Sequence, residues 1–341
     1  YMKKIKTVDA VGYVLQHDIT QILPGEFKGR AFKKGHIIKE EDIPKLLSLG
    51  KDHIYVFELG EVGVHENDAA LILGDLGRGE NIYTDDEIKE GKINFRAKCD
   101  GILKVDSENL LELNMLGEIS FATLPNNYPV EEGELIGGSR VIPLVVAKEK
   151  MEMAKSLIKT PILKVVPYKK YRVGIITTGN EVFYGRIEDK FGQVIKNKLS
   201  EYDCEIIGQV LCPDDKEIIK SRAKEFLDKG ANMLIFTGGM SVDPDDLTPS
   251  SIIEMGGELV TYGAPVLPGA MFLLSYLGDI PMMGLPGCVM FAKRTIFDLV
   301  LSRVMTGEKL SKRDIMMYGN GGLCQTCEVC HYPNCSFGKQ G

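Results

Sequence analysis

Glycines and acids are concentrated in one segment, residues 237–249, which follows the apolar run 233–236. It reads Thr-Gly-Gly-Met-Ser-Val-Asp-Pro-Asp-Asp-Leu-Thr-Pro, so a Gly pair precedes three aspartates, the last of which is Asp246. A Gly pair at the end of a strand lets backbone N–H groups approach an anion closely. Carboxylates beside such an anion are tolerated when a divalent cation lies between the charges. The segment therefore predicts a site for a phosphorylated ligand and Mg²⁺.

Two further glycine turns have a similar setting. Residues 177–182 read Thr-Thr-Gly-Asn-Glu-Val, and residues 285–288 read Leu-Pro-Gly-Cys. We expect all three turns at the carboxyl ends of strands, where open α/β sheets bind their ligands. The third turn leads into an expected helix, whose first N–H groups and dipole would favour phosphate. A single glycine turn usually only reverses the chain, whereas three such turns, two of them with acids, favour ligand binding.

The apolar pattern predicts the elements that position these turns. From about residue 171, strand-like runs alternate with helical stretches at the spacing of β-α-β units. The expected strands are 172–177, 205–210, 233–236 and 281–285, and the expected helices lie near 190–202, 215–229, 247–256 and 288–306. The predicted fold class is α/β, with a doubly wound, mostly parallel sheet preceded by smaller β-rich domains.

The pattern also predicts how the chain divides. We expect a small α/β unit at 1–60, a β-rich unit at 61–146, a linker helix within 147–167, the α/β domain at 168–307 and a Cys-rich tail at 308–341. The tail has no obvious apolar core, so we expect its structure to depend on its cysteines.

Composition limits the possible functions. The 341 residues are 44% hydrophobic and 26% charged, as in an ordinary globular protein. The net charge of -7 argues against a nucleic-acid partner. No apolar run approaches the ~20 residues of a membrane span. We therefore expect a soluble, cytoplasmic protein without membrane or nucleic-acid partners.

The tail contains a second candidate site, made of Cys324, Cys327, Cys330 and Cys335. Three cysteines with two residues between neighbours and a fourth nearby resemble an iron–sulfur ligand run, although the last gap is four residues instead of three. Zinc usually takes two separated Cys-x-x-Cys pairs. The spacing favours a [4Fe–4S] cluster, with Zn²⁺ as the alternative and a metal-free or disulfide-linked tail as the third possibility.

Taken together, the three glycine turns resemble the molybdopterin-binding domain of molybdenum cofactor biosynthesis, over residues 168–307. That domain occurs in molybdopterin adenylyltransferases and in molybdopterin molybdotransferases. Residues 8–19 and the Met-Ser-Val run at 240–242 are similar to the molybdotransferases, whereas the Asp-Leu-Thr-Pro ending at 246–249 is more similar to the adenylyltransferases. The resemblance is nearest to the molybdotransferases.

The resemblance implies roles for particular residues. Glu181 and Asp246 would be the catalytic acids, serving Mg²⁺ or the transfer of molybdate. The residues implied to contact molybdopterin are Thr178, Gly179, Asn180, Thr237, Gly238, Gly239, Ser241, Pro286, Gly287 and Cys288. The resemblance also implies a homodimer, because related proteins place this pocket near a subunit interface.

Three segments depart from the family pattern. Asn180 stands where the family has an acid, and Cys288 stands where it has Asn or Ser. Residues 25–36 resemble a small β-clip (SAF) ligand-binding module. At the expected start of a helix, Cys288 is either a reactive thiol with a lowered pKa or a small buried residue that begins the helix.

Three functions follow from these observations. The first is a molybdotransferase-like enzyme that inserts molybdate into molybdopterin or its adenylate. The second is a non-catalytic protein that binds or carries the cofactor, with the cysteine cluster sensing redox state or docking a molybdoenzyme. The third is a nucleotide-pyrophosphate hydrolase of the competence-damage-inducible type, whose Asp-Asp-Ile/Leu-Thr ending is echoed at 245–248.

Overall fold

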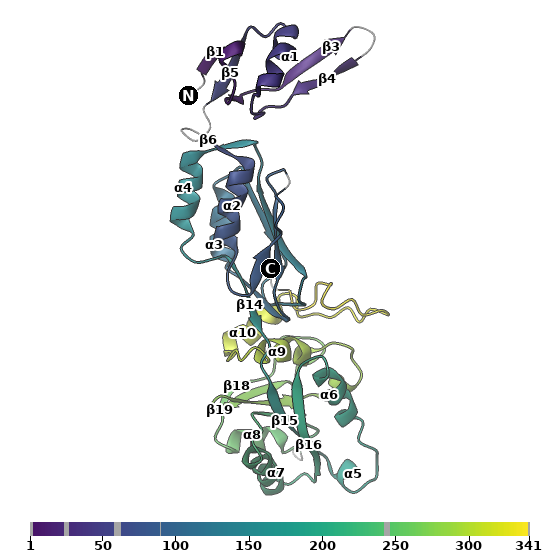
Figure 1. Cartoon of the computed structure of the whole chain (residues 1–341). Coiled ribbons are helices and arrows are strands. Elements are labelled where there is room, and N and C mark those ends of the chain that lie inside the picture. Colours follow the sequence, from purple (N-terminus) through teal and green to yellow (C-terminus); the bar gives the residue numbers. More distant parts are fainter. Residues whose placement is uncertain (1–2, 24–26, 58–62, 89, 242–245, 340–341) are drawn as a thin grey trace. The chain divides into compact units, whose positions relative to one another are not determined.

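The computed structural model describes residues 3–23, 27–57, 63–88, 90–241 and 246–339 (Figure 1). The chain folds into two compact units. The first comprises Tyr1–Cys99, Leu103–Leu124 and Val130–Val165, and the second comprises Asp100–Ile102, Pro125–Pro129 and Val166–Gly341. No helix among the described residues is both long and apolar enough to cross a membrane.

The first 57 residues combine two small antiparallel sheets with short helices. One sheet has the order β1 (Lys3–Lys6), β5 (His53–Phe57), β2 (Val14–Leu15), and the other pairs β3 (Ile19–Leu23) with β4 (Phe27–Phe32). The helical elements are η1 (Thr7–Asp9), η2 (Glu40–Asp42) and α1 (Ile43–Ser48). The expected β-clip segment at 25–36 falls partly on residues outside the described ones, and its described part contains β4.

The rest of the first unit has a four-stranded antiparallel sheet in the order β10-β12-β8-β7. The strands of this region are β6 (Gly63–His65), β7 (Ile82–Thr84), β8 (Ile93–Ala97), β10 (Ile119–Thr123), β12 (Leu135–Val141) and β13 (Val145–Ala147). Three further strands, β9 (Gly101–Val105), β11 (Tyr128–Val130) and β14 (Leu163–Pro167), have residues in both units. The expected linker helix is α4 (Lys148–Leu157).

Two helices of this region, α2 (Glu66–Gly77) and α3 (Ser107–Met115), were not expected from the sequence. Glycines inside α2 lower its helix propensity by ~1 kcal/mol each. The structure explains both, because a Cβ on Gly77 would lie 2.6 Å from the rings of Phe95 and Phe121, and one on Gly74 would lie 2.6 Å from the side chain of Ile93. The glycines let α2 pack directly on the sheet.

The second unit is built on a six-stranded sheet in the order β16-β15-β17-β20-β19-β18. Its parallel strands are β15 (Tyr171–Thr178), β16 (Cys204–Cys212), β17 (Met233–Thr237) and β20 (Ile280–Leu285). The four strands expected from the sequence are confirmed, and so is the α/β, mostly parallel fold class. Two antiparallel strands, β18 (Glu258–Tyr262) and β19 (Leu273–Leu277), were not expected.

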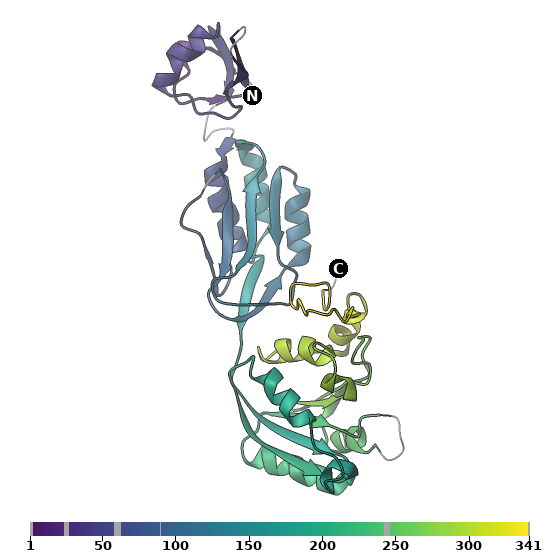
Figure 2. The same ribbon diagram turned by 90° about the vertical axis from the view of Figure 1, so that its right-hand side faces the viewer.

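Helices cover both faces of this sheet (Figures 1 and 2). They are α6 (Phe191–Leu199) and α9 (Ile296–Val304) on one face, and α7 (Lys216–Asp228) and α8 (Thr248–Glu254) on the other. Successive β15 residues serve opposite faces: Ile175 belongs to the core formed with Ile195 and Val300, and Ile176 to the core formed with Ile219. Because both of its faces are buried, the inner strand β17 is a continuous apolar run, whereas the edge strand β16 is mostly half-buried.

The helix expected at 288–306 begins later than predicted. A short 3₁₀ turn, η3 (Gly287–Met290), comes first, and α9 begins only at Ile296. Thr295 caps α9, because its hydroxyl accepts from the N–H of Phe297 at 3.2 Å and its own N–H donates to Asp298 at 2.7 Å. The prediction that Cys288 starts an α-helix was wrong, since this capping box fixes the start of the helix several residues downstream.

The prediction that the tail has no core was also wrong. The tail forms α10 (Lys312–Met316) and η4 (Met317–Gly319). Ile315, Tyr318 and Phe337 are at most 3% exposed and belong to the same core as α9. These three apolar residues are too widely spaced to give a periodic pattern in the sequence, so the sequence did not reveal that each packs on this core.

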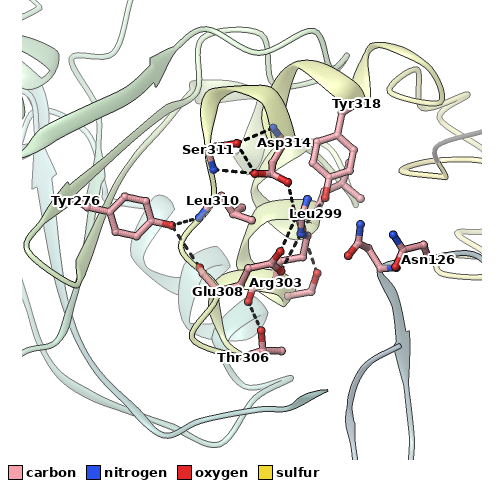
Figure 3. Close-up of polar contacts among 12 residues, drawn as sticks. Asn126, Tyr276, Leu299, Arg303, Thr306, Glu308, Leu310, Ser311, Asp314 and Tyr318 are labelled. Atoms are coloured by element: carbon pink, nitrogen blue, oxygen red, sulfur yellow. Dashed lines mark hydrogen bonds and ion pairs between the residues drawn. The ribbon is translucent and has the colours of Figure 1, made fainter. Parts of the chain in front are cut away.

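A buried ionic network joins α9 to α10 (Figure 3). The guanidinium of Arg303, which is 3% exposed, donates to Glu308 at 3.1 and 2.7 Å and to Asp314 at 2.9 Å. Asp314 also accepts from the N–H of Ser311 at 2.8 Å, which caps α10. The hydroxyl of Tyr276 accepts from the N–H of Leu310 at 3.0 Å. These bonds fix the segment between the two helices.

Candidate functional site

The first glycine turn follows β15 and leads into a short helix, α5 (Asn180–Phe183). Gly179 has a φ of 135°, which a residue with a side chain rarely adopts. The N–H of Asn180 donates to Asp214 at 3.0 Å, and the side-chain oxygen of Asn180 accepts from the N–H of Asp214 at 3.3 Å. An aspartate at position 180 would place a second carboxylate against Asp214, so the asparagine suits this reciprocal pair.

The second turn packs directly on the first. Gly238 and Gly239 have φ values of 80° and 52°. A Cβ on Gly238 would clash with the carbonyl oxygen of Thr178. A Cβ on Gly239 would lie 3.0 Å from the hydroxyl of Thr178 and 2.9 Å from that of Thr248. The two glycines are therefore required for the contact between the turns, whatever else they contact.

The threonine hydroxyls at these strand ends are used inside the protein. Thr237 is fully buried, and its hydroxyl donates to Thr177 at 3.2 Å. The hydroxyls of Thr178 and Thr248 share a hydrogen bond of 2.9 Å. Thr178 and Thr237 thus hold neighbouring strands and turns together.

The second and third turns border a cavity of about 600 Å³ at the carboxyl ends of β17 and β20. This volume lies within the range of small-molecule sites, ~300–1,000 Å³. The predicted residues that line it are Gly238, Gly239, Ser241, Asp246, Pro286, Gly287 and Cys288. The predicted residues that do not line it are Thr178, Gly179, Asn180, Glu181 and Thr237. The first turn thus supports the second turn and lies behind it.

The sequence did not point to the remaining wall of the cavity, formed by residues 267–271 and by Phe191. Residues 267–271 connect β18 to β19, the two strands that were not expected. A Pro-Gly pair at 268–269 between two apolar runs is a turn signal that could have identified this connection. Nothing in the local sequence places Phe191 at the cavity, because α6 brings it there.

Among the described residues, Asp246 is the only predicted acid that lines the cavity. Its carboxylate accepts from the N–H of Ser241 at 2.8 Å, across the undescribed residues 242–245 that include Asp243 and Asp245. The hydroxyl of Tyr262 donates to the carbonyl of Met240 at 3.1 Å. Burial, followed by the charge of Asp246, raises the pKa of Tyr262, so this hydroxyl stays protonated near neutral pH and keeps its donor.

Of the two alternatives for Cys288, the reactive thiol with a lowered pKa is not supported. Burial raises the pKa of the Cys288 thiol, and the N–H groups of Cys288 and Val289 that point at the sulfur offset this only in part. The residue is partly buried, which is nearer to the alternative of a small buried residue, although no α-helix begins there. Cys288 presents a neutral thiol to the cavity.

The four tail cysteines line a second cavity, of about 200 Å³, together with residues 291–294. All four are free thiols. As placed, the described residues include no group of three or more His, Cys, Asp or Glu side chains that could hold a metal ion.

Two families match parts of the chain. Residues 174–306 match the family described as a probable molybdopterin binding domain. Residues 4–58 match a family described as a domain of unknown function (DUF8806).

Curated relatives cover different lengths of the chain. The molybdopterin molybdenumtransferase of Haemophilus influenzae is 26% identical over 235 residues, which are 63% of this chain and 55% of the relative. A CinA-like protein of Mycobacterium avium is 30% identical over 95 residues, or 28% of this chain and 22% of the relative. The chain therefore spans about half the length of the first relative and less of the second.

Solved structures are similar to part of the chain. MoaB of Thermus thermophilus, described as a molybdopterin biosynthesis enzyme, has a TM-score of 0.33 and 22% identity, covering 40% of this chain and 98% of that one. The tungsten cofactor synthesizing protein MoaB of Pyrococcus furiosus has a TM-score of 0.33 and 22% identity, covering 40% and 93%. The region 174–306, which carries the three motifs and most of the parallel sheet, thus matches the family of probable molybdopterin binding domains and is similar to a molybdopterin molybdenumtransferase.

Proposed function

We propose that this protein inserts molybdate into molybdopterin, or into its adenylate, in the cavity between the second and third turns. The observation that carries the proposal is the position of these two family motifs, which face each other across about 600 Å³ at the carboxyl edge of the sheet. Open α/β sheets bind their ligands at this edge.

The lining suggests how the ligand is held. Asp246 is its only charged side chain among the described residues, so the phosphate would be bound by backbone N–H groups of the glycine turns. Phe191, Leu267 and Met271 supply apolar surface for the pterin rings. Their positions on separate segments would orient the flat ring system while the turns hold the phosphate.

Asp246 is a suitable residue for Mg²⁺. This ion commonly binds one or two carboxylates together with substrate phosphates and water. One carboxylate at the cavity fits that donor set, and a bound Mg²⁺ would neutralise the charges of carboxylate and phosphate. The N–H of Ser241 already orients this carboxylate.

Glu181 has less support than Asp246. It is exposed and lies beside the first turn, where its carboxylate would be 3.4 Å from a Cβ on Gly179. It does not line the cavity, so its role in molybdate transfer rests on the resemblance alone. A homodimer and a molybdoenzyme partner belong to the same proposal and derive from the resemblance.

Two observations favour other functions. The CinA-like relatives, 30–32% identical over 90–95 residues, favour a nucleotide-pyrophosphate hydrolase of the competence-damage-inducible type. The asparagine at position 180, paired with Asp214, favours binding of the cofactor without catalysis. Both functions use the same cavity, so an activity assay separates them.

The test is molybdate insertion by the full chain, with ADP-ribose hydrolysis measured in parallel. We expect insertion to fall at least tenfold in Asp246→Asn and Glu181→Gln, and to be unchanged in the control Glu108→Gln, an exposed acid on α3. Unchanged insertion in both acid variants would remove their catalytic roles. Hydrolysis of ADP-ribose without insertion would favour the second function, and ligand binding without either reaction would favour the carrier.

A further inference from the structure

The tail cysteines lie in a loop that is closed at its base. The N–H of Gly338 donates to the carbonyl of Gly321 at 2.9 Å. The beginning of the loop is bonded to Leu267. The N–H of Leu267 donates to the carbonyl of Gly322 at 2.9 Å, and its carbonyl accepts from the N–H of Cys324 at 2.8 Å. The loop between these bonds contains all four cysteines, and it is drawn in yellow, without helix or strand, in Figures 1 and 2.

Aromatic residues hold the other side of the loop on the core. Phe337 is 3% exposed, and Tyr332 packs against the same core. The guanidinium of Arg294 lies 4.9 Å from the centre of the Tyr332 ring, and the hydroxyl of Tyr128 donates to the side chain of Asn334. The ends of the loop are thus fixed by packing and hydrogen bonds that do not involve the cysteine sulfurs.

This closure places all four cysteines around one cavity of about 200 Å³. Cys324 and Cys335 are partly buried against the core, whereas Cys327 and Cys330 are exposed. Cys324 and Cys335 thus lie at the anchored ends of the loop, and Cys327 and Cys330 lie in its exposed middle part. As placed, no three of these thiols form a metal site, so cluster binding requires the exposed pair to move toward the anchored pair.

The cavity of about 200 Å³ leaves room for a polyatomic centre. Lys293 lines it, and a cationic side chain favours the net negative charge of an iron–sulfur cluster with four thiolate ligands. Arg294 also lines it, but its guanidinium is paired with Glu201 at 2.9 Å and with Asp298 at 3.1 Å.

We propose that Cys324, Cys327, Cys330 and Cys335 bind one [4Fe–4S] cluster, with the thiolates of the closed loop wrapped around it. This site is separate from the cavity of the proposed function and does not depend on it. The family match at 174–306 ends before the tail, so the cluster would be a property that this chain adds to the domain.

The test is anaerobic purification of the full chain, reconstitution with ferrous iron and sulfide, and measurement of iron, sulfide and zinc. We expect about four irons and four sulfides per chain, with an electron paramagnetic resonance signal after reduction. Cys327→Ala and Cys330→Ala should lose this content and keep the wild-type circular dichroism and melting temperature, since both thiols are exposed. Cys204→Ala, a partly buried thiol on β16, is the matched control and should keep the cluster.

Three results would overturn the proposal. One zinc per chain without sulfide would show a zinc site. Iron and sulfide contents that are the same in wild type and Cys330→Ala would show that this thiol is not a ligand. Loss of the free thiols in pairs under anaerobic conditions, without bound metal, would show disulfides.

Discussion

The clearest test of the cavity is the substitution Gly287→Ala. Gly287 lines the cavity, yet a Cβ added there would meet no atom within 4 Å, and its φ lies outside the left-handed region. The new methyl group would therefore point into open space in the free protein. We expect the free energy of unfolding to change by less than ~0.5 kcal/mol, as for surface substitutions.

The same methyl group should weaken binding. If the ligand contacts the backbone of the third turn closely, the methyl occupies its space, and inserting a methyl into a packed contact costs about 1–3 kcal/mol. That range corresponds to a loss of affinity of about 5- to 150-fold. The combination of unchanged stability and reduced affinity is specific for a residue whose only contact is with a ligand.

Gly238→Ala provides the contrast. Its φ of 80° and the clash of a Cβ with the carbonyl of Thr178 predict a loss of stability of at least ~1–2 kcal/mol before any ligand is added. The control is Gly138→Ala in β12, where the nearest atom, the side-chain oxygen of Asn94, would lie at an ordinary 3.4 Å. Gly138→Ala should leave both stability and binding unchanged.

Urea unfolding and calorimetric titration with molybdopterin measure the two quantities separately. Gly287→Ala with wild-type affinity would refute the proposed approach of the ligand to this turn. Gly287→Ala with a large loss of stability would refute the statement that its methyl group faces open space.

Four further predictions follow from the structure. Arg303→Met should lower the free energy of unfolding by about 3 kcal/mol in urea, the lower end of the range for a broken buried pair, because Glu308 and Asp314 are partly exposed and regain water. Burial alone would raise the pKa of Asp314, but hydrogen bonds from Ser311 and Arg303 lower this pKa from 3.8 to about 2. The stabilising contribution of Asp314 should therefore be present above pH 4 and disappear as the pH falls toward 2, which a falling melting temperature would show. Cys288, with its raised pKa, should react with iodoacetamide at neutral pH far more slowly than the exposed thiols of the tail, and equal rates would contradict the assignment. Asp246→Asn should weaken Mg²⁺-dependent ligand binding more than Mg²⁺-independent binding, and equal effects would exclude the metal role.

The parallel core of the second unit could be predicted from the sequence because its strands are buried on both faces. Such strands are continuous apolar runs between turn residues, and β15, β17 and β20 appear where expected. The edge strand β18 is mostly exposed, with Thr261 as its one buried residue, and gave no such run. The wall formed by residues 267–271 was missed for this reason.

The site could be predicted only as a set of turns. Which residues line the cavity depends on contacts between turns far apart in the sequence, such as the clash that Gly238 avoids with Thr178. The hydroxyl of Thr237 faces Thr177 because β15 and β17 are neighbours, a fact of topology and not of local sequence. The pairing of Asn180 with Asp214 likewise joins the ends of two strands.

The central claim is that the cavity between the second and third turns binds molybdopterin or its adenylate. The most direct test is calorimetric titration of the purified full chain with molybdopterin, its adenylate and ADP-ribose, each with and without Mg²⁺. We predict saturable binding of molybdopterin or its adenylate with one site per chain, weakened in Gly287→Ala. Binding of ADP-ribose alone, or pterin binding that is unaffected by Gly287→Ala and Asp246→Asn, would contradict the claim.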